Sequence, residues 1–256
     1  MLARKEGALG WLVFNNPERR NAMSVDMWEA VPRVIEGFEA DPDVRAIVLT
    51  GAGEKAFVSG ADISQFESQR SSAEAVQRYE EIGDAATARL YNCDKPVIAM
   101  IRGYCLGGGL GIANVCDLRI AAEDARFGIP AAKMGLGYRP GSMQRLVDLV
   151  GPAGAREIMI TARQYSAAEA KAMGLVHHVV PAAELESFTR RYCEDIAANA
   201  PLTQRAAKRI IREVVASPRY DAEKCRAWVR ECFESEDYKE GRKAFMEKRK
   251  PVFRGR

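Results

Sequence analysis

The sequence predicts an α/β fold whose C-terminal part is entirely helical. Two short apolar runs, at residues 44–49 and 97–101, are rich in β-branched side chains, which is typical of strands covered on both faces. A glycine-rich loop and then a helical pattern follow each run. After Pro181 only amphipathic helical patterns remain, interrupted at Pro201 and Pro218. Strand–loop–helix units first and helices last indicate an α/β body with a helical C-terminal region.

The length and composition are those of an ordinary globular protein. Its 256 residues, 47% hydrophobic and 29% charged, can bury a sizeable core without metal or disulfide staples. Residues 1–6 contain no apolar run typical of a signal peptide, and no window approaches the ~18 apolar residues of a membrane-spanning helix. The six cysteines form no C-x-x-C pair. We therefore expect a cytoplasmic protein with reduced thiols and no association with membranes.

Charge is distributed unevenly along the chain. The net charge is only +3, but residues 201–256 carry 16 basic against 9 acidic side chains. Such an excess is typical of solvated helix faces, and it also suits a polyanionic ligand. Nucleic acid is a weaker candidate, because no stacking motif or helix-turn-helix pattern accompanies the charge.

The first third of the chain should contain two strands and two helices. Residues 8–14 form the first strand, and Ser24 can cap a helix whose apolar positions follow helical spacing. Pro32 lies inside that helix and should kink or destabilise it. A loop spans residues 51–60, and Asp62 can cap the long helical stretch that follows.

The middle of the chain alternates short strands with helices. A turn at residues 103–106 leads into Gly107-Gly108-Gly109 and a small-residue helix that ends near residue 115. Further short strands are expected at residues 117–121, 126–128 and 176–180. Ser166-x-x-Glu169 is a capping box, and Gly174 can end the helix that it starts.

Two glycine-rich loops, at residues 51–63 and 107–111, follow buried strands and are therefore candidate ligand-binding elements. The first loop opens with G-x-G-x-x-A, which nominally fits a dinucleotide-binding fingerprint. That fingerprint requires a helix to begin among the glycines, whereas residues 57–60 intervene here. We therefore reject the dinucleotide interpretation.

The second loop, residues 107–111, admits two explanations. Glycines at a helix start let a ligand approach N–H groups that lack helical partners. Tight packing of the helix against its neighbours would select the same glycines. The residues alone leave both explanations open.

The two loops together resemble the signatures of the enoyl-CoA hydratase/isomerase (crotonase) superfamily. Residues 59–63, SGADI, are similar to its "AGADI" loop, and residues 98–109 are similar to its valine-rich strand followed by "NGxxxGGG". Further matches follow in order at residues 116–121, 125–128, 144–146, 166–170, 174–176 and 244–249. The resemblance implies a crotonase-like spiral of repeated ββα units over residues 1–195 and a C-terminal helical oligomerisation region over residues 196–256.

The resemblance also implies a substrate and a site. The substrate would be a coenzyme A thioester with no further cofactor, and its oxygen would lie in an oxyanion hole made by the N–H groups of Ala61 and Gly108. The substrate-binding residues would be Ser59, Asp62, Ile63, Ser64, Gly107 and Ala131, with Phe245 and Lys248 contributed by a neighbouring subunit. Family members are lyases and isomerases of fatty acid metabolism, usually homotrimers or homohexamers built as dimers of trimers.

The sequence departs from the family pattern where acid/base chemistry is carried out. Hydratases of the family use two glutamates, and Gly111 and Ala131 occupy those positions here. The nearest replacement is Tyr138, because decarboxylases of the family place a tyrosine in this segment to orient a malonyl-type carboxylate. Arg139 could pair with such a carboxylate. The sequence leaves open an enolate-forming enzyme, a malonyl-type decarboxylase that uses Tyr138, and an acyl-CoA-binding relative without turnover.

Other chemistries find no support in the sequence. His177 and His178 are adjacent in a predicted strand, so they point to opposite faces and cannot share one metal ion. There is no G-x-S-x-G elbow and no G-x-x-x-x-G-K-S/T loop. We therefore expect no metal site, no α/β-hydrolase triad and no nucleotide hydrolase.

Overall fold

Two β-sheets form the centre of the protein, whose structure, a computed structural model, describes residues 1–62 and 73–256. The larger sheet has the strand order β1-β2-β3-β5-β7-β10. Its strands are β1 (Leu2–Glu6), β2 (Leu9–Phe14), β3 (Ala46–Gly51), β5 (Val97–Ile101), β7 (Leu118–Ala122) and β10 (His178–Val180). The smaller sheet has the order β4-β6-β8-β9. Its strands are β4 (Ala56–Val58), β6 (Tyr104–Leu106), β8 (Arg126–Gly128) and β9 (Tyr165–Ser166).

One structural unit recurs along the chain. β3, β5 and β7 are neighbours in the larger sheet, and each is followed by a strand of the smaller sheet, namely β4, β6 and β8. A helix then follows: α3 (Ala73–Tyr91), α4 (Gly108–Val115) or α5 (Pro140–Thr161). This repetition confirms the predicted spiral of ββα units.

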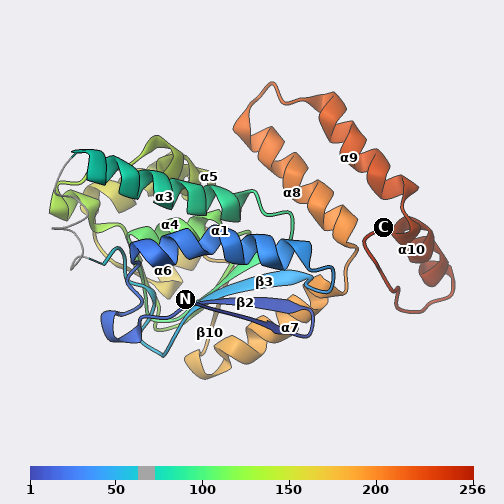
Figure 1. Cartoon of the computed structure of the whole chain (residues 1–256), viewed down its shortest axis with the longest axis horizontal. Helices are drawn as coiled ribbons and strands as arrows, with labels where there is room; N and C mark the ends of the chain where they lie inside the picture. Colours follow the sequence, from blue (N-terminus) through green and yellow to red (C-terminus); the bar gives the residue numbers. More distant parts are fainter. Residues whose placement is uncertain (63–72) are drawn as a thin grey trace.

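Both faces of the larger sheet are covered, as the apolar runs predicted. Residues Leu12, Ile47 and Leu49 belong to the main hydrophobic cluster, which includes α1 (Val25–Ala40). Their neighbours Trp11 and Val48 point to the other face, where they join a second cluster with α7 (Leu185–Ala197). Figure 1 shows α1 and α7 on opposite sides of the strands.

The helix α1 begins where the sequence predicted. The Ser24 side chain accepts a hydrogen bond from the Met27 N–H, which is an N-terminal cap. The helix runs from Val25 to Ala40 with Pro32 inside it, so the proline does not end the helix, and the expected kink stays a prediction. Proline removes one helical donor, and the expected cost in stability remains a prediction.

The short strands of the smaller sheet were only partly predicted. The expected loop 51–60 contains β4, and the expected turn 103–106 contains β6, so both predictions are wrong at these residues. β4 and β6 have three residues each and pair with one another in parallel. Partners from distant parts of the chain, rather than a local pattern, make these residues strands.

The second half of the chain follows the predicted outline. α5 bends at Gly151, which has a non-helical backbone, and the capping box of Ser166 and Glu169 starts α6 (Ala167–Ala172). The last three helices are α8 (Pro201–Ala216), α9 (Ala222–Glu234) and α10 (Glu236–Met246). Pro201 is thus the first residue of α8, and Pro218 lies between α8 and α9. The predicted boundary between residues 195 and 196 lies near the end of α7, and the division into two regions stays a prediction.

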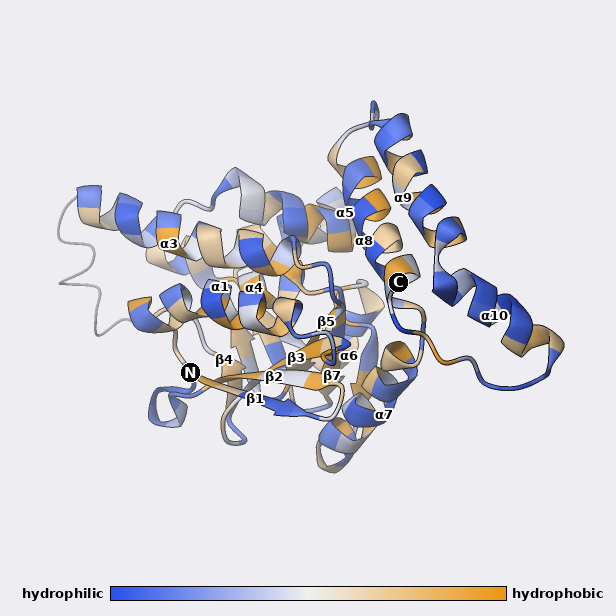
Figure 2. Ribbon diagram, turned by 45° about the vertical axis from the view of Figure 1, so that its right-hand side comes forward, coloured by the Kyte–Doolittle hydropathy of each residue, from blue (hydrophilic) through white to orange (hydrophobic). Residues whose placement is uncertain are grey.

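The helices of the C-terminal region are amphipathic. Figure 2 shows hydrophobic and hydrophilic residues alternating along α8 and α9. Of the residues that the structure describes, no helix is long and apolar enough to cross a membrane. Five of the six cysteines are buried and none is disulfide-bonded.

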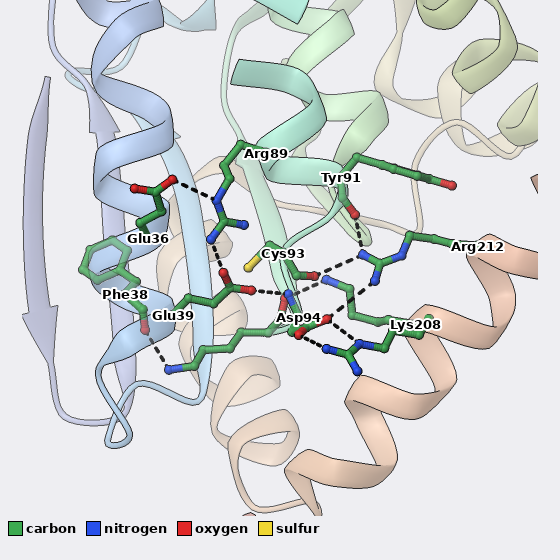
Figure 3. A network of polar contacts seen from close by, with 11 residues as sticks. Glu36, Phe38, Glu39, Arg89, Tyr91, Cys93, Asp94, Lys208 and Arg212 are labelled. Carbon is green, nitrogen blue, oxygen red and sulfur yellow. Dashed lines mark hydrogen bonds and ion pairs between the residues drawn. The ribbon is translucent and has the colours of Figure 1, made fainter. Parts of the chain in front are cut away.

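Charged side chains fasten α8 to the ββα core (Figure 3). Arg209 donates to the Asp94 carboxylate over 2.9 Å, and Lys208 donates to the Lys95 carbonyl and to the Asp117 carboxylate over 2.6 Å each. Arg212 donates to the Tyr91 carbonyl over 2.7 Å. These bonds hold α8 against the segment between α3 and β5.

Candidate active site

The first predicted loop, residues 59–62, leaves the end of β4 and pairs with the segment before α1. The Met23 N–H donates to the Gly60 carbonyl over 2.9 Å, and the Asp62 N–H donates to the Met23 carbonyl over 3.0 Å. Gly60 has a φ of +124°, a conformation that glycine adopts without strain. The pairing fixes the peptide group of Ala61 between two hydrogen bonds. No partner for the Ala61 N–H itself is found within residues 1–62 and 73–256.

The second loop turns directly from β6 into α4. Gly107 caps the helix with a φ of +52°, and its N–H donates to the Gly128 carbonyl over 2.9 Å. The first helical bond runs from the Gly111 N–H to the Gly107 carbonyl over 3.0 Å. Gly108 is the first helical residue, so its N–H lies outside the helical ladder and is available to a ligand.

The glycines of this run have different roles. A Cβ on Gly109 would lie 2.1 Å from the Val58 carbonyl oxygen, so this glycine permits tight packing of α4 on β4. Gly107 is required by its positive φ. A Cβ on Gly108 would meet only the Trp28 ring, at 3.5 Å. Packing therefore explains Gly109. It does not require a glycine at position 108, where ligand access is the remaining explanation.

The two loops meet at one cavity of about 260 Å³. A Cβ on Gly107 would lie 3.8 Å from the Cα of Gly60, and one on Gly60 would lie 3.7 Å from the Leu106 carbonyl oxygen. The two loops are thus so close that a single added methyl group on either glycine would contact the other loop. The predicted residues that line the cavity are Ser59, Ala61, Gly107, Gly108, Gly111, Ala131, Tyr138 and Arg139.

The two positions at which the family resemblance predicts glutamates face this cavity, and neither carries an ionisable group. Gly111 and Ala131 both line it. A Cβ on Gly111 would lie 3.8 Å from the Tyr138 hydroxyl oxygen, so Tyr138 adjoins the space where the glutamate side chain would begin. Among the described lining residues, the only carboxylate is that of Glu80, whose side chain is exposed.

Tyr138 is a half-buried side chain that packs against the main hydrophobic cluster. Burial raises the pKa of Tyr138 to about 12, although the Arg139 charge opposes this effect. The phenol is therefore neutral at physiological pH and can donate a hydrogen bond to a ligand. The hydrogen bonds of the described chain include none to its hydroxyl group.

Arg139 lines the cavity but is already engaged with α3. Its Nη1 donates to the Glu80 carbonyl over 2.7 Å and lies 2.6 Å from the Asp84 carboxylate. The side chain joins α3 to the start of α5. The predicted pairing of Arg139 with a substrate carboxylate stays a prediction. Such a carboxylate would have to share the guanidinium with Asp84.

The other predicted residues lie around or away from the cavity. Asp62 is buried and accepts a hydrogen bond from Arg19 over 3.0 Å, while the Ser59 hydroxyl donates to the Arg19 carbonyl over 3.3 Å. Both contacts secure the first loop. Ile63 and Ser64 lie outside the described residues, as does part of the helical stretch that Asp62 was predicted to cap.

Phe245 lies in the last turn of α10 and Lys248 follows the end of that helix. α10 itself lies on the side of the molecule away from α3 (Figure 1). Neither residue lines the cavity of the same chain. Phe245 is 83% exposed, which suits a residue that contacts another molecule. The predicted contact with coenzyme A across a subunit boundary stays a prediction, as does the trimeric or hexameric assembly.

Several lining residues escaped the sequence analysis. The Trp28 Nε1 donates to the Tyr79 hydroxyl over 3.1 Å, which joins α1 to α3 at the cavity wall. Thr87, Met134 and Leu136 also line the cavity. Trp28 belongs to the apolar face of α1, so its helical spacing signals burial rather than a site. No local sequence pattern marks Thr87, Met134 and Leu136 as residues of the cavity.

A buried arginine supports α4 from its other end. Arg119 is 1% exposed and donates to the carbonyls of Ala113, Cys116 and Leu175 over 3.0, 2.7 and 2.8 Å. Its charge lies at the C-terminal end of α4, where the helix dipole favours a cation. Arg119 therefore adds a donor to carbonyls at the end of α4, where the helical ladder supplies few.

The repeated ββα units and the glycine-lined cavity define a crotonase-type protein. The enoyl-CoA hydratase/isomerase family model matches residues 4–256, and the chain belongs to this family.

Individual relatives match over nearly their whole length. The chain is 38% identical to the short-chain-enoyl-CoA hydratase of Clostridium acetobutylicum, covering 98% of this chain and 95% of the relative. It is 35% identical to the peroxisomal Delta(3,5)-Delta(2,4)-dienoyl-CoA isomerase of Arabidopsis thaliana, covering 94% and 91%. The crystal structure of an enoyl-CoA hydratase/carnithine racemase from Magnetospirillum magneticum superposes with a TM-score of 0.94 at 36% identity, covering 99% and 95%.

Proposed function

We propose that this protein binds an acyl-CoA thioester and stabilises its enolate with the N–H groups of Ala61 and Gly108. The observation that carries the proposal is that these two residues, from separate loops, line one cavity without an intramolecular partner for either N–H among the described residues. Donors already aimed at a developing oxyanion lower a reaction barrier by a few kcal/mol each. The names of the relatives, which act on enoyl- and dienoyl-CoA, support the choice of substrate class.

The reaction itself differs from paired-carboxylate hydration in this proposal. General acid/base groups each contribute about 10²–10⁴-fold to a rate, and Gly111 and Ala131 supply none. Hydration of crotonyl-CoA should therefore be slow. The oxyanion hole does not depend on those side chains, so reactions that form an enolate by another route remain compatible with the cavity.

Decarboxylation of a malonyl-type thioester is the second candidate, favoured by the position of Tyr138. Loss of carbon dioxide leaves the electron pair of the broken C–C bond on the thioester as an enolate, and a proton then adds to the carbon. No base is needed for the first step. A neutral Tyr138 hydroxyl beside Gly111 could orient the carboxylate before it leaves. The third candidate, an acyl-CoA-binding relative without turnover, requires only the cavity.

Three assays separate these candidates. Purified protein is mixed with crotonyl-CoA while the enoyl absorbance is followed, and then with malonyl-type thioesters while carbon dioxide release is measured. Calorimetry reports acyl-CoA binding. Carbon dioxide release that falls in Tyr138→Phe supports decarboxylation, and binding without either activity supports the third candidate. Rapid crotonyl-CoA hydration would contradict the emphasis on Gly111 and Ala131.

A pair of substitutions at Gly108 tests the oxyanion hole directly. Gly108 is the first residue of α4, where proline fits the helix, removes the N–H and places a ring carbon in its direction. Alanine keeps the N–H, and its Cβ would meet the Trp28 ring at an ordinary 3.5 Å. We expect Gly108→Pro to lower kcat of any detected activity by about 10²–10³-fold and Gly108→Ala to lower it far less. Equal losses in the two variants would remove the Gly108 N–H from the mechanism.

A further inference from the structure

One large aromatic side chain adjoins the glycine-rich loops at the cavity. Trp28 belongs to α1 and lines the cavity. Its Cζ2 would lie 3.5 Å from a Cβ on Gly108, in ordinary van der Waals contact. The loop residues that line the cavity have small side chains or none, namely Ser59, Gly60, Ala61, Gly107 and Gly108. In the described parts of the chain, Trp28 is therefore the bulky side chain in contact with the Gly108 end of the cavity.

The indole ring of Trp28 is held in place in two ways. The side chain is 6% exposed and belongs to the main hydrophobic cluster. Its Nε1 donates to the Tyr79 hydroxyl over 3.1 Å, and Tyr79 also lines the cavity, from α3. Side chains in a close-packed interior yield little to an added methyl group. The ring is therefore a fixed part of the cavity wall.

The position of the ring determines which part of an acyl thioester would be nearest to it. An oxygen that accepts a hydrogen bond from the Gly108 N–H lies about 3 Å from the Gly108 nitrogen. The α-carbon of the acyl group is two bonds from that oxygen. With the thioester bound as proposed above, the α-carbon is thus close to Gly108 and to the ring that contacts this residue.

We propose that Trp28 is a specificity-determining residue that admits unbranched acyl thioesters and excludes those with a branch at the α-carbon. The inference rests on the proposed binding of acyl-CoA. An unbranched chain presents only hydrogen atoms to the ring, whereas a methyl branch would press against it. One methylene group more or less in an apolar pocket changes the preference about 10–200-fold. Tyr79 is a positioning residue, because it acts through the ring of Trp28.

Calorimetry with the full chain compares butyryl-CoA with isobutyryl-CoA. The two acyl groups contain the same atoms and differ in the branch, and neither carries the double bond or the carboxylate of the candidate reactions. We expect the wild-type protein to bind butyryl-CoA at least about tenfold more tightly. In Trp28→Leu, isobutyryl-CoA should gain affinity, and the ratio of the two dissociation constants should approach one. Trp228→Leu, the same change on α9 and outside the cavity, should keep the wild-type ratio.

Two further variants test the size of the ring and its anchor. Trp28→Phe keeps a smaller aromatic ring, and Tyr79→Phe removes the hydroxyl group that accepts from the indole. Each should give a ratio between those of the wild-type protein and Trp28→Leu. If Trp28→Leu does not fold, Trp28→Phe decides, and a wild-type ratio in Trp28→Phe would then overturn the proposal. A wild-type ratio in Tyr79→Phe would overturn the positioning role of Tyr79.

The remaining outcomes separate this inference from the proposed function. Equal affinities of the wild-type protein for the two thioesters, a preference for isobutyryl-CoA, or a wild-type ratio in Trp28→Leu would overturn the specificity and leave acyl-CoA binding intact. A ratio that falls equally in Trp228→Leu would assign the change to general loosening of the protein, which also overturns the role of Trp28. Failure of both thioesters to bind to the wild-type protein would overturn the proposed function as well.

Discussion

A Cβ on Gly109 would lie 2.1 Å from the carbonyl oxygen of Val58 and 2.8 Å from its Cβ. The contact joins the first turn of α4 to β4, the strand that leads into the other loop of the cavity. One glycine thus sets the separation between the two segments that carry the proposed donors.

Gly109→Ala should destabilise the protein because backbone atoms cannot yield as a flexible side chain would. Overpacking of this kind costs about 1–3 kcal/mol. Urea unfolding measures the free energy of unfolding, and Gly108→Ala is the matched control, since its Cβ meets nothing nearer than 3.5 Å. Equal stability of the two variants would show that α4 can move away from β4 at little cost.

Arg119→Met should be among the most destabilising single changes in this chain. It leaves the carbonyls of Cys116 and Leu175 without the donor that now satisfies them, whereas the Ala113 carbonyl keeps the Cys116 N–H. Each unsatisfied buried group costs about 1–3 kcal/mol, so we expect a loss of at least about 2 kcal/mol in urea unfolding. Arg126→Met is the control, because Arg126 is exposed and donates only to nearby carbonyls. A loss no larger than that of the control would mean that water replaces the guanidinium.

His177 should make stability depend on pH. Burial, with the charges of Arg119 and His178, lowers the pKa of His177 from 6.5 to about 4, and its Nδ1 accepts a hydrogen bond from the Arg119 N–H over 3.2 Å. The unfolded chain therefore takes up a proton before the folded chain does. The contribution to stability is full above pH 6.5 and is lost as the pH falls from 6.5 toward 4.

The measurement compares the wild-type protein with His177→Gln at several pH values. The side chain also reaches solvent, so we expect a modest effect. The stability difference between the two proteins should shrink between pH 7 and pH 4.5. An NMR titration of the His177 ring with a midpoint near 6.5 would contradict the lowered pKa.

Asp94→Asn should loosen the attachment of α8. The Asp94 carboxylate accepts two hydrogen bonds from Arg209 and lies 3.6 Å from Arg212 (Figure 3). Bonds to charged groups contribute about 1.5–3 kcal/mol, whereas exposed ion pairs contribute about 0–1 kcal/mol. We expect faster amide hydrogen exchange in α8, and no such change in the control Glu223→Gln, which breaks an exposed pair on α9. Unchanged exchange would assign the docking of α8 to its apolar contacts alone.

Much of the fold could be predicted because its signals are local. The apolar runs of β3 and β5, the Ser24 cap and the Ser166–Glu169 capping box each act through neighbouring residues. β4 and β6 could not be predicted, because three-residue strands gain their stability from partners far along the chain.

The site, like the fold, could be predicted from the sequence only in part. The resemblance located Ala61 and Gly108, and the structure brings both to one cavity. The Trp28–Tyr79 hydrogen bond and the engagement of Arg139 with Asp84 depend on how α1, α3 and α5 pack together.

Gly107, with its positive φ, turns the backbone into the first turn of α4, where Gly108 lies. Since the proposed donors, the N–H groups of Ala61 and Gly108, belong to the peptide backbone, exchanging the side chains at positions 111, 131 and 138 leaves them in place. If the proposed function holds, new chemistry can arise on this scaffold through changes in the cavity wall, while the proposed thioester-binding donors are inherited unaltered.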